Sequence, residues 1–181
     1  MATSRSDGTL EERLKARLRV VPDFPSPGIM FQDITPVLAD AALLREAVAA
    51  MAAPWRDAGV THVAGIEARG FVFGGAVAIE LEAGFIPIRK PGKLPYRSVG
   101  QEYALEYGSG RLEMHEDACP SGARVLVVDD VLATGGTARA ACELVEGVGG
   151  LVLGCAFFLV IEALAGLQRL QGREVRMLVP S

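Results

Sequence analysis

The residue types best suited to chemistry are two adjacent carboxylates, Asp129 and Asp130, and the run Thr134-Gly135-Gly136-Thr137 that follows them. This run supplies free backbone N–H groups, two hydroxyls and no bulk, and the start of a helix adds about half a positive charge there. Such a cradle suits a phosphate monoester. The carboxylates would repel phosphate, but they accept hydrogen bonds from vicinal hydroxyls. Together they predict a ribose-phosphate site; the alternative is an Asp-capped turn and a glycine-containing helix start that bind nothing.

A strand and a helix must position these groups. The apolar run Val125–Val128 shows no alternation, which is typical of a strand buried on both faces of a parallel sheet. We expect this strand to end on the two aspartates, a loop to follow over 131–135, and a helix to span 138–146. Ligands of open α/β sheets bind beyond the carboxyl ends of the strands, where the next helix begins. Similar patterns predict helices over 10–20 and 40–56, strands over 61–66, 85–88, 110–114, 152–161 and 175–179, and a short helix between the last two strands.

The stretch V-L-V-V-D-D-V-L-A-T-G-G-T resembles the signature with which type I phosphoribosyltransferases bind 5-phosphoribosyl-1-pyrophosphate (PRPP). The resemblance implies an α/β fold with a mostly parallel central sheet flanked by helices. It also implies a single domain over 1–181, with a small N-terminal hood at about 20–38 and a flexible lid loop at about 89–111. The ribose would be bound by Asp129 and Asp130. The 5′-phosphate would be bound by Ala133, Thr134, Gly135, Gly136 and Thr137.

The stretch from Pro22 to Gly28 contains three prolines, so neither a helix nor an inner strand accommodates it, and we expect an irregular surface arm. The apolar residues that follow could attach the arm to the core or line a pocket for a flat heterocycle. The run P-D-F-P-S-P-G-I-M-F-Q-D-I-T-P resembles the base-binding hood of the adenine-specific phosphoribosyltransferase family. The resemblance implies that Phe31 stacks on the purine and that main-chain groups of Met30 read its edge. Gln32 departs from the arginine often found there in that family.

Two further stretches place cations after predicted strands. Arg69, in E-A-R-G, suits either a second anion or a surface salt bridge. The stretch from Arg89 to Gly100 carries four cations among two prolines and two glycines, and is either a functional lid or a solvated run of charge. The resemblance implies pyrophosphate contacts, some of them across a dimer interface, from Arg69, Arg89, Lys90 and Lys93.

The catalytic group implied by the resemblance is Glu106, in the motif A-L-E-Y-G. It would protonate N7 of the base in one direction and accept that proton in the other. Phosphoribosyltransferases for 6-oxopurines resemble one another in placing a lysine, which donates to O6, just after the strand that corresponds to residues 152–161. Residues 157–164 contain no lysine, which favours adenine.

Composition limits the remaining classes. A chain of 181 residues with 50% hydrophobic content suffices for one domain, and a net charge of −4 argues against a general nucleic-acid or membrane-surface binder. Three scattered cysteines without C-x-x-C spacing argue against a disulfide framework or zinc site and fit a reducing cytosol. Residues 1–19 lack an apolar signal core, and the apolar run over 151–161 is too short to span a bilayer.

The resemblance therefore implies a cytoplasmic homodimer that converts adenine and PRPP to AMP and pyrophosphate. Mg²⁺ would be carried by PRPP, with no direct protein ligand, and neither nucleic acid nor membrane would be a partner. Two alternatives stay open: transfer to another base, such as xanthine or a pyrimidine, and a PRPP-sensing regulator without turnover. The lid, Glu106, the acidic pI and the lack of an appended helix-turn-helix segment disfavour the regulator.

Overall fold

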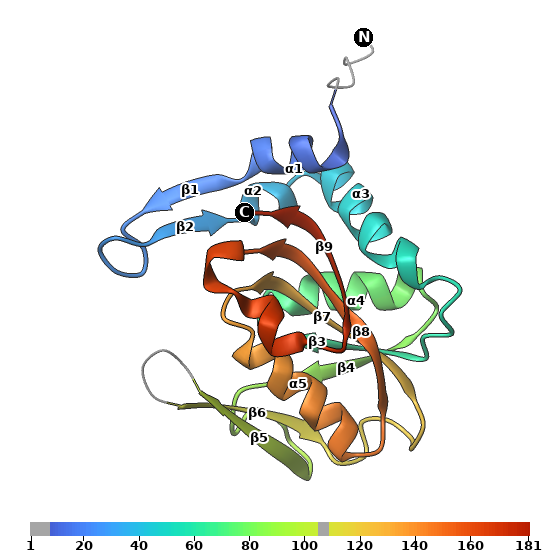
Figure 1. Cartoon of the computed structure of the whole chain (residues 1–181). Coiled ribbons are helices and arrows are strands. Elements are labelled where there is room, and N and C mark those ends of the chain that lie inside the picture. Colours follow the sequence, from blue (N-terminus) through green and yellow to red (C-terminus); the bar gives the residue numbers. More distant parts are fainter. Residues whose placement is uncertain (1–7, 105–108) are drawn as a thin grey trace. The chain divides into compact units, whose positions relative to one another are not determined.

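The computed structural model of the chain describes residues 8–104 and 109–181 (Figure 1). It divides into two compact units, Met1–Ala47 and Val48–Ser181. Helix α3, Ala41–Ala52, crosses the boundary between them. Asp40 Oδ1 accepts hydrogen bonds from the N–H groups of Ala42 and Leu43 at 3.1 and 3.2 Å, so Asp40 is the predicted N-cap. Pro54 ends the helix earlier than expected, and a 3₁₀ turn, η1, follows over Ala53–Trp55.

The smaller unit contains α1 (Leu10–Arg17), β1 (Arg19–Pro22), β2 (Met30–Asp33) and α2 (Thr35–Leu38). Helix α1 begins with a capping box between Thr9 and Glu12. It ends before residue 20, where we expected its end, because Arg19–Pro22 pair in antiparallel register with Met30–Asp33. The predicted irregular arm is therefore the turn of a two-stranded ribbon. Asp23 holds this turn closed by accepting the Gly28 N–H at 2.8 Å.

The larger unit is built on an all-parallel five-stranded sheet (Figure 1). Its spatial order is β4-β3-β7-β8-β9. The predicted doubly buried strand is confirmed, because Val125–Val128 in β7 are inaccessible to solvent. The strands span His62–Ile66 (β3), Gly84–Ile88 (β4), Arg124–Leu132 (β7), Leu151–Val160 (β8) and Glu174–Pro180 (β9).

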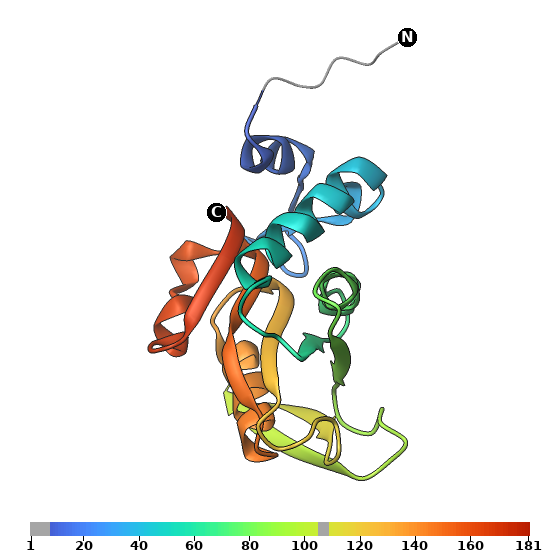
Figure 2. The same cartoon turned by 90° about the vertical axis from the view of Figure 1, so that its right-hand side faces the viewer.

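Helices α4 (Gly70–Glu80) and α5 (Gly136–Gly147) follow β3 and β7, respectively, and cover opposite faces of the sheet (Figures 1 and 2). From β3 the chain moves through α4 to β4 on one side, and from β7 it moves through α5 to β8 on the other. Because both crossovers obey the right-handed rule, the reversal of direction puts the helices on different faces. The strand order therefore reverses between β3 and β7, and such a switch point is where α/β sheets bind ligands.

Three local expectations differ from the structure. Strand β7 does not end on the aspartates but continues to Leu132, because its pairing with β8 continues as far as Val160. Much of the expected lid loop is an antiparallel hairpin of β5 (Ser98–Ala104) and β6 (Ser109–His115). The short helix expected after β8 is two 3₁₀ turns, η2 (Glu162–Leu164) and η3 (Gly166–Leu170). Within the described ranges, none of the helices has the length and apolarity needed to cross a membrane.

Candidate active site

The ends of β3 and β7 bring together residues that are far apart in sequence. Asp129 and Asp130 lie near the end of β7 and are buried, with 9% and 6% of their surface exposed. Arg69, in the turn after β3, donates from Nε to Asp130 Oδ2. When only side-chain atoms are counted, Arg69 is 46% exposed and Asp130 is 9% exposed. The predicted ribose and pyrophosphate residues are therefore in direct contact.

Asp129 is enclosed by the first turn of α4. A Cβ on Gly70 would collide with Asp129 Oδ1 and lie 3.2 Å from Asp129 Cα, so only glycine lets the helix approach this closely. Asp129 Oδ1 also accepts the N–H of Asp130 at 2.9 Å. Burial raises the pKa of the Asp129 carboxyl well above its usual value, and the charge of Asp130 adds to the increase.

Residues 133–137, here called the phosphate loop, connect β7 to α5. Gly135 is the N-cap of α5 in a left-handed conformation (φ +81°), and no side chain caps the helix. The first N–H groups of α5 have no acceptor within the helix and can serve an anion. Gly166 lies against this loop: a Cβ there would collide with Ala133 O and lie 3.1 Å from Gly135 N. The turn after β8 therefore fixes the loop from behind.

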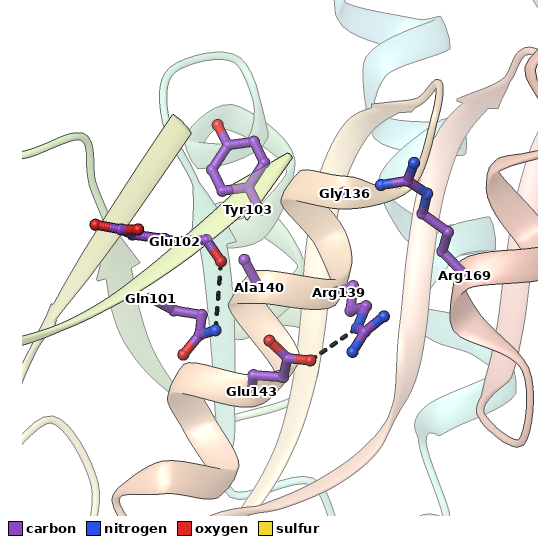
Figure 3. Close-up of a pocket in the computed structure, with 8 residues that line it drawn as sticks. All are labelled: Gln101, Glu102, Tyr103, Gly136, Arg139, Ala140, Glu143 and Arg169. Atoms are coloured by element: carbon purple, nitrogen blue, oxygen red, sulfur yellow. Dashed lines mark hydrogen bonds and ion pairs between the residues drawn. The ribbon is translucent and has the colours of Figure 1, made fainter. Parts of the chain in front are cut away.

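A cavity of about 440 Å³ lies along the flank of α5, between that helix and β5 (Figure 3). Gly136 and Arg169 line its end at the start of the helix, and Arg169 extends from η3 toward Gly136. Farther along, Arg139 Nε donates to Glu143 Oε1 at 2.7 Å. The remaining lining residues are Gln101, Glu102, Tyr103 and Ala140. The cavity thus places the Arg169 cation beside the phosphate loop.

The predicted pyrophosphate residues after β4 gather on a carboxylate. Glu67 accepts hydrogen bonds from Arg89 Nε at 3.0 Å, Lys93 Nζ at 2.6 Å and the Lys90 N–H at 3.0 Å. Burial raises the pKa of Glu67, but these three donors outweigh burial, so the net pKa is below its usual value. The peptide bond from Glu67 to Ala68 is cis. We call residues 89–111 the lid segment. Ion pairs and a hydrogen bond of Glu67 therefore join the turn after β3 to the start of this segment.

The remaining predicted site residues lie in the smaller unit or outside the described residues. Met30 and Phe31 belong to β2 in the smaller unit, where the Phe24 and Phe31 rings meet edge to face at 5.0 Å. Met30 is 62% exposed. Glu106 lies outside the described residues. The adenine-binding and acid/base assignments therefore stay predictions.

Sequence reasoning missed three residues near this site. Glu67 belongs to the motif E-A-R-G, and a carboxylate after a buried strand and before several cations is a usable signal. Gly166 and Arg169 lie in a stretch with no recognisable motif. Their proximity to the phosphate loop arises because β8 pairs beside β7, which no local pattern encodes.

A parallel sheet whose order reverses beside an uncapped helix start is typical of α/β proteins that bind phosphorylated ligands. The family model described as phosphoribosyl transferase domain matches residues 38–178. An adenine phosphoribosyltransferase of Myxococcus xanthus is 59% identical over 171 residues, which cover 94% of this chain and 92% of the relative.

Solved structures agree with these relatives. Adenine phosphoribosyltransferase from Rhodothermus marinus superposes with a TM-score of 0.91 at 50% identity, covering 95% of this chain and 98% of its own. The enzyme from Saccharomyces cerevisiae, complexed with an imino-altritol bisphosphate and adenine, gives a TM-score of 0.88 at 36% identity, covering 93% and 98%. The chain belongs to the phosphoribosyltransferase family and, within it, to the adenine phosphoribosyltransferases.

Proposed function

We propose that this chain transfers the 5-phosphoribosyl group of PRPP to adenine, forming AMP and pyrophosphate in purine salvage. The observation that carries the proposal is the meeting of Arg69, Asp129 and Asp130 at the reversal of strand order, next to the start of α5. The adenine phosphoribosyltransferases to which the chain is similar support adenine as the acceptor.

The contact between Arg69 and Asp130 suits the structure of PRPP. In this molecule the pyrophosphate leaves from C1 of the ribose, and the neighbouring C2 carries a hydroxyl. A cation for the first group must therefore lie beside an acceptor for the second, as Arg69 and Asp130 do. In the proposal Asp130 and Asp129 accept from the ribose hydroxyls and favour the positive charge that develops at C1.

The phosphate loop would bind the 5′-phosphate. N–H groups at the start of α5 and the hydroxyls of Thr134 and Thr137 supply the donors, and the absence of side chains at Gly135 and Gly136 leaves room for the anion. Binding this distant group holds C1 in position, so binding energy far from the reacting carbon assists the chemistry.

The remaining assignments concern the base and the leaving group. Phe31 would stack on adenine, main-chain groups of Met30 would read its edge, and Glu106 would exchange a proton with N7. Pyrophosphate would meet Arg69 together with cations of the lid segment, namely Arg89, Lys90 and Lys93. Closure of that segment would exclude water, which could otherwise hydrolyse PRPP.

Mg²⁺ belongs to this proposal as an ion held by phosphate oxygens, ligands that it prefers. When bound, it would neutralise negative charge on the pyrophosphate group. Across residues 8–104 and 109–181 there is no group of three or more His, Cys, Asp or Glu side chains that could hold a metal ion. A homodimer in the cytoplasm completes the proposal.

The direct test is product analysis after the protein is mixed with adenine, PRPP and Mg²⁺. We expect AMP and pyrophosphate in equal amounts, and preference for adenine when labelled hypoxanthine, xanthine and uracil compete with it. Conversion of another base with the higher kcat/KM would replace adenine as the substrate. PRPP binding without any nucleotide product would favour a regulator instead.

Glu106→Gln is the matched variant for the same assay. We expect turnover to fall roughly 10²–10⁴-fold, the usual contribution of a positioned proton donor, with little change in PRPP affinity. Unchanged turnover would remove Glu106 from the chemistry and leave the substrate assignment intact.

A further inference from the structure

Glu67 joins the turn after β3 to the start of the lid segment. Its side chain is 6% exposed, whereas those of its partners Arg89 and Lys93 are 34% and 47% exposed. The carboxylate is therefore enclosed while both cations reach solvent. An enclosed carboxylate that accepts three hydrogen bonds holds its partners in defined positions.

Both cations retain donors that Glu67 does not use. Arg89 gives Nε to Glu67 and Nη1 to Lys93 O at 3.3 Å, whereas a guanidinium has five N–H donors. Lys93 makes one contact to Glu67, and an ammonium has three N–H donors. The three side chains together carry one net positive charge, so the group still attracts an anion.

Two cations that converge on one ligand repel each other unless an anion lies between them. Glu67 supplies that anion from within the protein, so Arg89 and Lys93 are adjacent before a ligand arrives. Arg89 is held further by the Phe71 ring, 5.9 Å from its guanidinium carbon, and by paired backbone hydrogen bonds to Glu113 at 2.7 and 2.9 Å. Preorganisation of this kind lowers the entropic cost of binding.

We propose that Glu67 is a positioning residue that presents Arg89 and Lys93 together to the pyrophosphate group of PRPP. The inference rests on the proposed function, because it takes pyrophosphate as the anion. The inference assigns a carboxylate to a site that binds a highly charged anion. A search for cations alone would miss this residue. The effect of Glu67 on the ligand is exerted through the two cations and not through a contact of its own.

The test is Glu67→Gln, which keeps the size of the side chain and removes its charge. We expect the Kd for pyrophosphate, measured by calorimetry with pyrophosphate and Mg²⁺, to rise about tenfold, as expected for loss of a charged hydrogen bond. The KM for PRPP should rise by a similar factor, while the KM for adenine stays within about twofold.

Glu113→Gln is the matched control. Glu113 contacts the same segment, through the Gly92 N–H at 3.0 Å, but does not bind the side chain of Arg89 or Lys93. It should leave pyrophosphate affinity unchanged. Equal losses in the two variants would mean that Glu67 only braces the segment and would overturn the proposal, as would unchanged affinity in Glu67→Gln.

Thermal unfolding of each variant establishes that it folds. If Glu67→Gln does not fold, Glu67→Asp replaces it, because that variant keeps the charge but shortens its reach. We then expect a smaller rise in the pyrophosphate Kd, and no rise would overturn the inference. The calorimetric titration needs no turnover, so it decides the matter even if the wild-type protein makes no AMP.

Discussion

Asp129 and Asp130 are neighbours in sequence but have different surroundings. Asp130 is paired with Arg69, whereas Asp129 lies against Gly70 at the start of α4. No cation pairs with Asp129 among the ion pairs of residues 8–104 and 109–181, and burial raises its pKa. A charged group that is enclosed at a cost to stability is typical of a functional site.

This difference predicts that Asp129→Asn stabilises the protein and reduces its activity. Burial raises the folded-state pKa of Asp129, so above the unfolded value of about 3.9 the folded protein binds more protons than the unfolded chain. Wild-type stability therefore falls as pH rises from there through the folded pKa, and the Asn variant avoids this loss. Each kcal/mol gained should raise Tm by about 2–4 °C.

The measurement is thermal unfolding of both proteins at a series of pH values upward from the unfolded pKa of about 3.9. The advantage of the variant should grow with pH, while its kcat/KM for PRPP falls. Asp130→Asn is the comparison variant, because it loses the ion pair with Arg69 and removes only one of the causes of the raised Asp129 pKa, so any gain should be smaller than that of Asp129→Asn. An advantage that does not depend on pH would contradict the assignment of the effect to the Asp129 charge.

At the level of elements, the phosphate loop depends on a turn that follows a different strand. Gly135 and Gly166 approach each other so closely that a Cβ on either would collide with backbone of the opposing segment. Strand pairing between β7 and β8 delivers both segments to the same edge of the sheet. The geometry of the phosphate loop therefore depends on the connections that follow β7 and β8, and not on the local motif alone.

We expect Gly166→Ala to displace the phosphate loop, because its Cβ would overlap Ala133 O, a backbone atom that cannot rotate away. Overpacking of this kind costs about 1–3 kcal/mol, and the KM for PRPP should rise about tenfold. Steady-state kinetics and thermal unfolding provide the measurement.

Gly147→Ala serves as the control for this substitution. It lies at the end of α5 with nothing within 4 Å of the added Cβ, so it should leave the KM unchanged and stabilise the helix by less than the roughly 0.5–1 kcal/mol gained in a helix interior. An unchanged KM in Gly166→Ala would show that the turn can yield without affecting phosphate binding.

At the level of the whole chain, the predicted base site and the predicted sugar-phosphate site fall in different units. The phosphoribosyl transferase match begins at residue 38, so the expected base-binding ribbon lies outside it. The adenine phosphoribosyltransferase of Myxococcus xanthus instead matches 171 residues, or 94% of the chain. This division fits a sugar-phosphate site shared across the family and a base site particular to the adenine-specific members.

This division predicts that Phe31→Ala weakens adenine binding and leaves PRPP binding unchanged. Stacking of a base on an aromatic ring contributes about 1–3 kcal/mol, so the KM for adenine should rise about tenfold or more. Phe24→Ala is the control, since Phe24 packs edge to face with Phe31 but is not assigned a contact with the base, so it should have a smaller effect. Equal losses for adenine and PRPP in Phe31→Ala would refute the stacking assignment.

Local patterns sufficed for much of the larger unit. The strand around Val125–Val128 and the helix after Gly136 are evident from an apolar run, a glycine pair and their spacing, because burial and backbone freedom act over a few residues. The ribbon of β1 and β2 was missed for the opposite reason. Its pairing competes with helix formation at Arg19–Pro22 and depends on partners about ten residues away.

The sequence alone determined the class of ligand, since the order of acids, glycines and threonines over residues 129–137 dictates where charge and free N–H groups lie. Only the tertiary structure decided which distant groups join them. Arg69 forms an ion pair with Asp130, and Glu67 forms ion pairs with Arg89 and Lys93. Gly166 packs against the phosphate loop. These contacts follow from the order in which the parallel strands pair, and strand order is set by packing across the whole sheet rather than by any one segment.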